Sequence, residues 1–184
     1  MKLKEYGTFI KLLLTLVVLN LVSNTAFAQE EPELDPLRFY RAKYDLTFTE
    51  SFDVVKDAVT AVLEDIQCLT TQNVLKTDKD GFNRQIIKSD FCVFVEGDST
   101  FEKLRFFSKE MPFIRGGTWK NGRMQYNFVV TEQAEGSTYL LLKGNLSGFE
   151  NYVTNKVHFW ESNGQLEQAI LDAITEKVKK LSNK

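Results

Sequence analysis

Hydrophobic and polar residues alternate along several segments of this chain, and other segments repeat their apolar residues every three to four positions. The first alternation runs over Tyr40–Phe48, and its period of two predicts a strand with one face on a core. Thr49 or Ser51 then offers a side-chain oxygen as an N-cap. An apolar stripe predicts a helix from about Phe52 to Gln67.

Further strands are predicted on both sides of turn residues. Leu69–Thr77 and Asn83–Glu96 flank Asp80-Gly81, a pair that supplies the positive φ angles of a tight hairpin. A second turn signal, Asn121-Gly122, precedes the alternating residues Met124–Val130. Two more extended segments follow, at Thr138–Leu142 and, by way of Gly144–Phe149, at Tyr152–Trp160. The connections between them are too short for parallel crossovers, so we expect antiparallel pairing.

The chain closes with a long predicted helix. Ser162 and Gln165 have the spacing of a capping box, and an apolar stripe runs from Leu166 to Leu181. The segment Ser99–Lys109 also fits a short amphipathic helix that presents Phe101, Leu104 and Phe107.

This order of elements predicts an α+β fold with two layers. One antiparallel sheet of about five to seven strands is expected to pack against a helix that follows the first strand and against the long C-terminal helix. The order resembles the helix-grip architecture, as in the repeat domains of the outer-membrane assembly lipoprotein BamC and in the larger Bet v 1 and START lipid-carrier domains. The resemblance covers residues 40–181, rests on element order, and implies a fold only.

The N-terminus has the layout of a secretory signal peptide. Lys2, Lys4 and Lys11 precede an apolar run from Leu12 to Val22, and a polar stretch ends in Ala26-Phe27-Ala28. We therefore expect residues 1–28 to be removed by cleavage between Ala28 and Gln29. The apolar run is too short to cross a bilayer, and no Cys follows it that could carry a lipid.

The mature chain is expected to be soluble and periplasmic or extracellular. Its first residues, 29–37, are rich in acid and proline and predict a disordered leader, and residues 38–184 form one predicted domain. The full chain carries 23 Lys and Arg against 25 Asp and Glu. This balance argues against a dedicated nucleic-acid binder, and we expect no transmembrane anchor in the mature chain.

Two cysteines, Cys68 and Cys92, stand on either side of the predicted hairpin. Hairpin pairs sum to 161 for a two-residue loop and to 160 for a three-residue loop, and the two cysteine numbers sum to 160. In an oxidising compartment this register favours a disulfide. Two buried thiols that pack as small apolar groups are the alternative.

Motifs for catalysis or cofactor binding are missing from the sequence. His158 is the one histidine, and the chain has no HExxH, GxSxG, GxGxxG or GxxxxGK[ST] pattern. We therefore predict that the protein is not an enzyme and that it has no cofactor and no metal site. His158 is expected to be a plain strand residue.

Residues 101–123 are the segment with the most distinctive composition. Basic residues outnumber acidic ones there by four, and aromatic residues are interleaved with them. The candidate patch comprises Lys103, Arg105, Phe106, Arg115, Trp119, Lys120 and Arg123. Such a surface suits an envelope protein with acidic groups or an anionic amphiphile. Alternatively, the aromatic residues complete the core and the basic groups are solvated above it.

The sequence therefore favours a non-enzymatic binding or interaction domain of the cell envelope. A carrier that holds a hydrophobic or lipid ligand in a cavity between the sheet and the C-terminal helix is the alternative. A filled interior would favour the first function and a cavity of several hundred Å³ the second.

Overall fold

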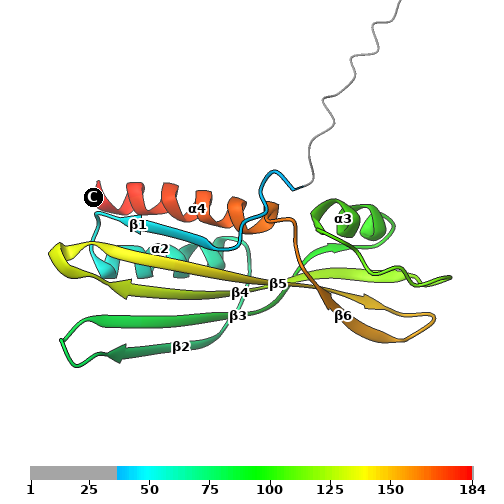
Figure 1. The fold of residues 1–184 in the computed structure, drawn as a ribbon, viewed down its shortest axis with the longest axis horizontal. Helices are drawn as coiled ribbons and strands as arrows, with labels where there is room; N and C mark the ends of the chain where they lie inside the picture. The colour runs from blue at the N-terminus through cyan, green and yellow to red at the C-terminus, as the bar shows by residue number, and fades with distance from the viewer. Residues whose placement is uncertain (1–36, 184) are drawn as a thin grey trace, which may run out of the picture. The chain divides into compact units, whose positions relative to one another are not determined.

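The computed structural model describes residues 37–183, and the predicted signal peptide, its cleavage site and leader residues 29–36 lie outside this range. The elements are β1 (Tyr44–Phe48), α2 (Phe52–Asp65), β2 (Thr70–Thr77), β3 (Asn83–Glu96), α3 (Thr100–Phe107), β4 (Trp119–Glu132), the 3-10 turn η1 (Ala134–Gly136), β5 (Thr138–Glu150), β6 (Lys156–Trp160) and α4 (Gln165–Ser182). The predicted α+β fold, with a helix after the first strand and a long C-terminal helix on the sheet, is confirmed (Figure 1).

The six strands of the described residues form one antiparallel sheet in the order β1-β5-β4-β3-β2. The sixth strand, β6, shares an edge of β5 with β1. β1 pairs with the first part of β5 as far as Tyr44↔Leu142, and β6 pairs with the last part from Trp160↔Leu146. Between these two pairs, over residues 143–145, the edge of β5 has no strand partner among the described residues.

The cross-strand pairs show which residues lie on each of the two faces of the sheet, because paired residues share a face. One row that faces the helices is Asn73–Ile87–Phe128–Leu142–Tyr44, and its members from β3, β4, β5 and β1 are buried. The apolar stripes of α2 and α4 cover this face, and Lys177 of α4 binds Asp65 of α2 at 2.6 Å. The core residues of both helices are at most 7 % exposed, so side chains fill the layer between them and the sheet.

The third described helix, α3, covers the other end of the same face. Leu104 of α3 is fully buried and lies against Gly122 of β4, where a Cβ would come within 2.7 Å of Leu104 Cδ2. The predicted turn at Asn121-Gly122 is therefore wrong, because both residues lie inside β4. The glycine serves a close approach of helix and sheet instead of a bend.

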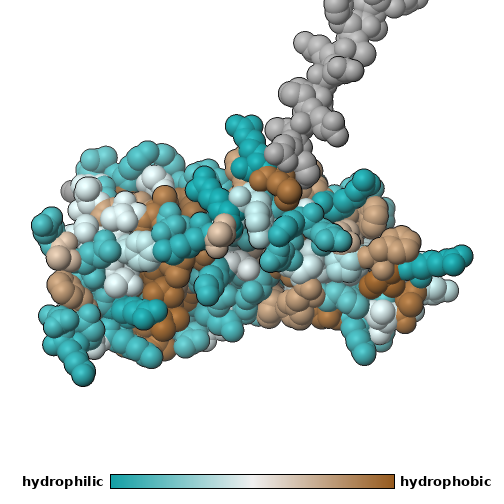
Figure 2. Space-filling model, in the orientation of Figure 1, coloured by the Kyte–Doolittle hydropathy of each residue, from teal (hydrophilic) through white to brown (hydrophobic). Residues whose placement is uncertain are grey.

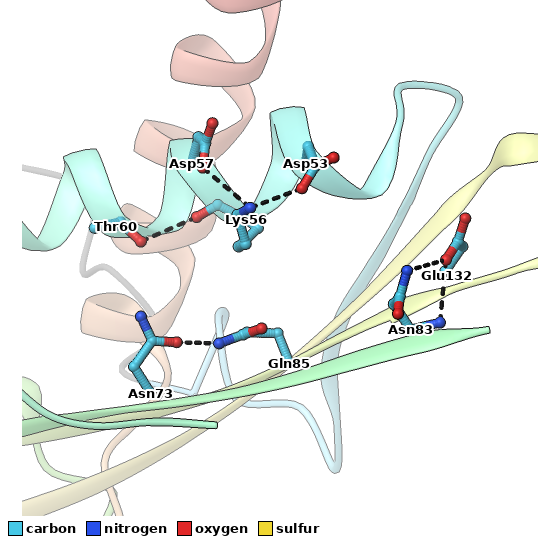
Figure 3. A network of polar contacts seen from close by, with 8 residues as sticks. All are labelled: Asp53, Lys56, Asp57, Thr60, Asn73, Asn83, Gln85 and Glu132. Carbon is cyan, nitrogen blue, oxygen red and sulfur yellow. Dashed lines mark hydrogen bonds and ion pairs between the residues drawn. The ribbon is translucent and has the colours of Figure 1, made fainter. Parts of the chain in front are cut away.

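Near β2 the helix-facing side of the sheet becomes polar (Figure 3). The Gln85 amide donates a hydrogen bond to Asn73 Oδ1 on the adjacent strand, and Asn83 Nδ2 donates to Glu132 at 2.9 Å. Lys56 of α2 forms ion pairs with Asp53 and Asp57 on its own helix. This end of the sheet is thus held by polar contacts that remain near solvent.

A disulfide joins Cys68, which follows α2, to Cys92 of β3, with 5.4 Å between their Cα atoms. The hairpin pairs sum to 160 from Thr77↔Asn83 to Gln72↔Lys88, the second of the two registers expected. A bulge then follows, and Cys68 itself lies just before the strand. The bond therefore ties the end of α2 to the sheet.

The remaining differences from expectation concern the ends of strands. β1 begins at Tyr44 instead of Tyr40, since its pairing with β5 begins at Tyr44↔Leu142, and the Tyr40 hydroxyl donates to Glu161, beyond the end of β6. The three predicted strands of the second half are present, but β5 is one long strand through Gly144. α4 begins at Gln165 with Gly164 as N-cap, and Ser162 binds Glu167 instead of closing a capping box with Gln165.

Candidate functional site

The residues of the candidate patch are spread over two faces of the domain. Lys103, Arg105 and Phe106 are exposed on α3, and Arg115 and Lys120 are exposed on the loop after it and at the start of β4. Trp119 is buried against Trp160, with 5.2 Å between the ring centroids. Arg123 is half-buried and pairs with Val93 and Ser147, on the side of the sheet away from α3.

Five of the seven patch residues therefore lie on α3, on the loop after it or at the start of β4. The other two, Trp119 and Arg123, do not lie on this surface. Trp119 belongs to the core, as expected for aromatic residues that complete it. The exposed aromatic residues at this end include Phe106 and Phe113, and Phe113 is 90 % exposed.

A different surface is defined by the side of the sheet that faces away from the helices, which we call the open face. α2, α3 and α4, the helices of the described residues, all pack on the opposite side (Figure 1). Because strand partners share a face, the register defines its rows. The central row is Val74–Ile86–Val129–Leu141, with Asp45 at its end.

These four apolar residues come from β2, β3, β4 and β5, and each is partly exposed. They form a band at right angles to the strands. In Figure 2 a hydrophobic band crosses the left half of the molecule between hydrophilic margins. An alternating strand normally turns polar residues to solvent, so a continuous apolar row is unusual for a face that meets water alone.

Basic residues flank this band on both sides. The row nearer the β2–β3 turn begins with Lys76 and Arg84, and the row on the other side contains Lys88 and Lys143. In these three rows Asp45 is the acidic member, and it forms an ion pair with Lys43 at 3.1 Å. The open face is therefore apolar at its centre and cationic at its margins.

The size of the open face suits a protein interface. Five strands at a spacing of about 4.8 Å, with about ten residues per strand on average and about 3.3 Å per residue, cover about 800 Å². That is about the area that one partner buries in a stable complex.

A small pocket lies where β1 and β6 leave the edge of β5 without a partner. Its volume is about 290 Å³, and it is lined by residues 40–44, which precede and begin β1, by residues 141–145 of β5, by Glu161 and Ser162 after β6, and by Glu167 of α4. Arg41, Lys43 and Lys143 contribute to the lining, as does Glu161, which is held by Lys109 at 2.7 Å.

Glu167 of α4 is the buried acid of this pocket and is 3 % exposed. Its Oε1 accepts a hydrogen bond from the Ser162 hydroxyl, whereas its Oε2 is buried and has no hydrogen-bond partner among the described residues. Burial raises the pKa of Glu167 and outweighs the bond from Ser162, which lowers it. A carboxyl group in this state is costly without a ligand or partner.

Glycine 144 permits this arrangement. A Cβ on Gly144 would overlap the Glu167 carboxyl group and Met124 Cε. The nearby Tyr44 hydroxyl is already engaged, because it accepts a bond from the Arg41 amide and donates one to the Phe39 carbonyl. Burial raises the pKa of Tyr44, and the neighbouring charge of Glu167 adds to the rise.

Neither Glu167 nor the open face was predicted from the sequence. The signal for Glu167 was present, since it shares the helical stripe of Ile170, Leu171 and Ile174. An acidic residue at a position of the apolar stripe of a helix is expected to be buried with that stripe. The rows of the open face, by contrast, depend on the register of four strands, which no single strand pattern supplies.

Comparisons with family models, with curated proteins and with solved structures found no match. Among residues 37–183, no helix is long and apolar enough to span a membrane.

Proposed function

We propose that this chain is an exported, non-enzymatic binding domain whose open face docks an acidic protein. The observation that carries the proposal is the apolar row Val74–Ile86–Val129–Leu141 between two margins of Lys and Arg. Cations around an apolar centre favour a partner with acidic groups around its own apolar contact, because opposite charges steer the encounter and fix its orientation.

Two further observations support a binding domain. The layer between the sheet and helices α2 and α4 is filled by buried side chains, which favours an interaction domain over a carrier with a cavity there. The Cys68–Cys92 disulfide is consistent with an oxidising compartment such as the periplasm or the extracellular space.

The exposure of the band favours a protein over a lipid membrane. Val74, Ile86, Val129 and Leu141 are half-buried between their neighbours on the sheet, so only part of each side chain is open to a contact from outside. A firm partner surface can contact such side chains without insertion.

The test begins with site-specific photo-crosslinking in the native host. A photoreactive residue replaces Val129 in the band, and a control carries it at Phe113, which is exposed in the loop between α3 and β4 and is not part of the band. The protein captured from position 129 is then purified, and its affinity is measured for two charge-reversal variants. One is Lys76→Glu, Arg84→Glu and Lys88→Glu on the open face. The matched control is Arg105→Glu, Arg115→Glu and Lys120→Glu near α3.

We expect the open-face variant to bind the captured acidic protein about tenfold more weakly or worse, since each reversed surface charge is worth about 0.5–1 kcal/mol. The control variant should bind within about twofold of the wild type. Weaker binding by the control variant alone would assign the interface to α3. Binding to anionic vesicles or to a second copy of the chain, without an acidic protein, would overturn the proposal. So would lipid found reproducibly in the purified protein by extraction and native mass spectrometry.

A further inference from the structure

The pocket at the edge of β5 has an arrangement of charge that the proposed function does not use. At its base lies Glu167, whose Oε2 is buried and has no hydrogen-bond partner among residues 37–183. The other polar groups nearby are occupied, since the Ser162 hydroxyl donates to Glu167 Oε1 and the Tyr44 hydroxyl donates to the Phe39 carbonyl. One acceptor atom therefore remains for a group that enters from outside.

The mouth of the pocket carries the opposite charge. Lys43 is paired with Asp45, and Glu161 is paired with Lys109. The other cations of the lining are Arg41 and Lys143, both exposed, and the ion pairs of the described residues do not include either one. From solvent inward, a ligand thus meets first the positive charges of Arg41 and Lys143 and then the acidic group of Glu167.

This order determines what can enter. A simple cation would be attracted by Glu167 but repelled by Arg41 and Lys143, and a simple anion would stop at the mouth. A molecule that carries both charges satisfies both ends. A primary ammonium group offers N–H donors to the free Oε2, and a carboxylate or phosphate on the same molecule pairs with the cations at the mouth.

The dimensions agree with a small molecule. The volume of about 290 Å³ is at the lower end of ligand pockets, and the opening lies over three residues of β5, which is too short for an added strand. Gly144 is part of the lining next to Glu167, and a larger residue at 144 would occupy the position of the carboxyl group.

We propose that this pocket binds a small zwitterion, with its ammonium group on Glu167 Oε2 and its anionic group between Arg41 and Lys143. The shared chemistry is that of an aminoalkyl phosphate or carboxylate, either free in solution or as the headgroup of a lipid. The site goes beyond the proposed function, and none of the three residues reversed on the open face lines it.

The probe is phosphoethanolamine, compared with ethyl phosphate, which lacks the ammonium group, and with ethanolamine, which lacks the anion. Titrations up to about 10 mM are followed by the backbone amide signals of Gly144 and Glu167 in NMR spectra of the oxidised protein, since ligands of this size bind weakly. We expect saturable shifts at both amides with phosphoethanolamine and at least about tenfold weaker binding of either half.

Three variants locate the contacts. Glu167→Gln removes the charge that the ammonium group needs and should weaken binding about tenfold or more, whereas Glu176→Gln, on an exposed turn of the same helix, should leave it unchanged. Arg41→Met, at an exposed position, should weaken binding several-fold with the fold intact. The fold of each variant is checked by the dispersion of its NMR spectrum.

The proposal is overturned if phosphoethanolamine causes no saturable shift at Gly144 and Glu167. It is also overturned if ethyl phosphate binds as tightly, which would leave an adventitious anion site only, or if both Glu167→Gln and Arg41→Met bind like the wild type. Flotation with vesicles that contain phosphatidylethanolamine, against vesicles of phosphatidylcholine alone, then identifies the source. Flotation with the first vesicles indicates a lipid headgroup, and binding of the free probe without flotation indicates a soluble ligand.

Discussion

Phe91 of β3 and Phe159 of β6 meet edge to face with 5.7 Å between their ring centroids, although β4 and β5 lie between their strands. Three strand spacings of about 4.8 Å would place these positions about 14 Å apart on a flat sheet. The open face is therefore concave at this end, and the two rings close over the strands between them. Gln125 and Ser147, which lie on those strands, are buried as a result.

This contact predicts a coupling between two residues distant in the sequence. Phe91→Leu and Phe159→Leu should each destabilise the domain, and the double variant should lose less than the sum, with a coupling of about 0.5–1.5 kcal/mol. Urea unfolding of the four proteins measures it. Phe113→Leu serves as control, since that ring is 90 % exposed, and it should leave the unfolding midpoint unchanged. Additive losses would show that the rings do not stabilise the curvature.

A carboxylate organises the turn between β5 and β6. Glu150 accepts hydrogen bonds from the amides of Thr118, Tyr152, Val153 and Thr154. Burial acts to raise the pKa of Glu150, but these amide donors outweigh it and hold the pKa well below the ordinary value of 4.5. The stabilisation is therefore present above pH 4.5 and is lost as the pH falls below it.

Replacing the Glu150 carboxylate with an uncharged group should remove this stabilisation at every pH. We expect Glu150→Gln to lower the unfolding midpoint at pH 7, because a neutral amide is a weaker acceptor for four donors. The difference from the wild type should shrink as the pH falls toward 3. The exposed Glu161→Gln is the control and should change the midpoint little. A difference that persists unchanged in acid would contradict the role of the ionised group.

Glu167 should have the opposite pH dependence. Its pKa is raised, chiefly by burial, so the folded state favours the protonated carboxyl and its stability falls as the pH rises above the ordinary value of 4.5. The other titratable groups whose pKa values respond to its charge are Tyr44 of β1 and Tyr126 of β4, and both are raised and therefore neutral in this range. Glu167→Gln should show a smaller decline in unfolding free energy between pH 4 and pH 8 than the wild type. Parallel curves for the two proteins would refute the assignment.

The disulfide should contribute a large part of the stability. Cys68 and Cys92 are 24 residues apart, and closing a loop of this length in the unfolded chain is worth about 3 kcal/mol. The Cys68→Ser, Cys92→Ser variant should therefore have a free energy of unfolding lower by about that amount, and a lower urea midpoint. Wild-type protein treated with dithiothreitol should match it. Equal midpoints for oxidised and reduced protein would contradict the prediction.

The sequence predicts local elements well where one residue pattern determines them. The stripe of α2 and the alternation of Tyr44, Leu46 and Phe48 follow from periods of 3.6 and 2, and both elements are present. The Asn-Gly pair at residues 121 and 122 was misleading, because the same residues that favour a turn also permit the close approach of α3. A single sequence does not distinguish these two uses of glycine.

The candidate surfaces were harder to predict because they depend on pairing. Lys88 and Lys143 become neighbours of one row only when β3, β4 and β5 are in register, and Arg123 leaves the predicted patch for the same reason. For Trp119 the sequence left two positions open, an exposed patch or the core. A bulge in β4 lies beside it, and its ring packs in the core against Trp160. The composition indicated which residue types the surfaces contain, whereas the pairing register of the strands determined which of these residues lie together.

The three unpaired residues between β1 and β6 also affect self-association. The strands on either side of them, β1 and β6, are edge strands of only five residues each, so this side of the sheet offers no long free edge for growth by strand addition. The eight-residue strand β2 forms the opposite edge, and it is exposed along nearly its whole length and carries one lysine and no proline. If concentrated protein forms chains of molecules through their sheets, each new contact is expected to begin at β2, and a proline or a second lysine in that strand is the change that would prevent it.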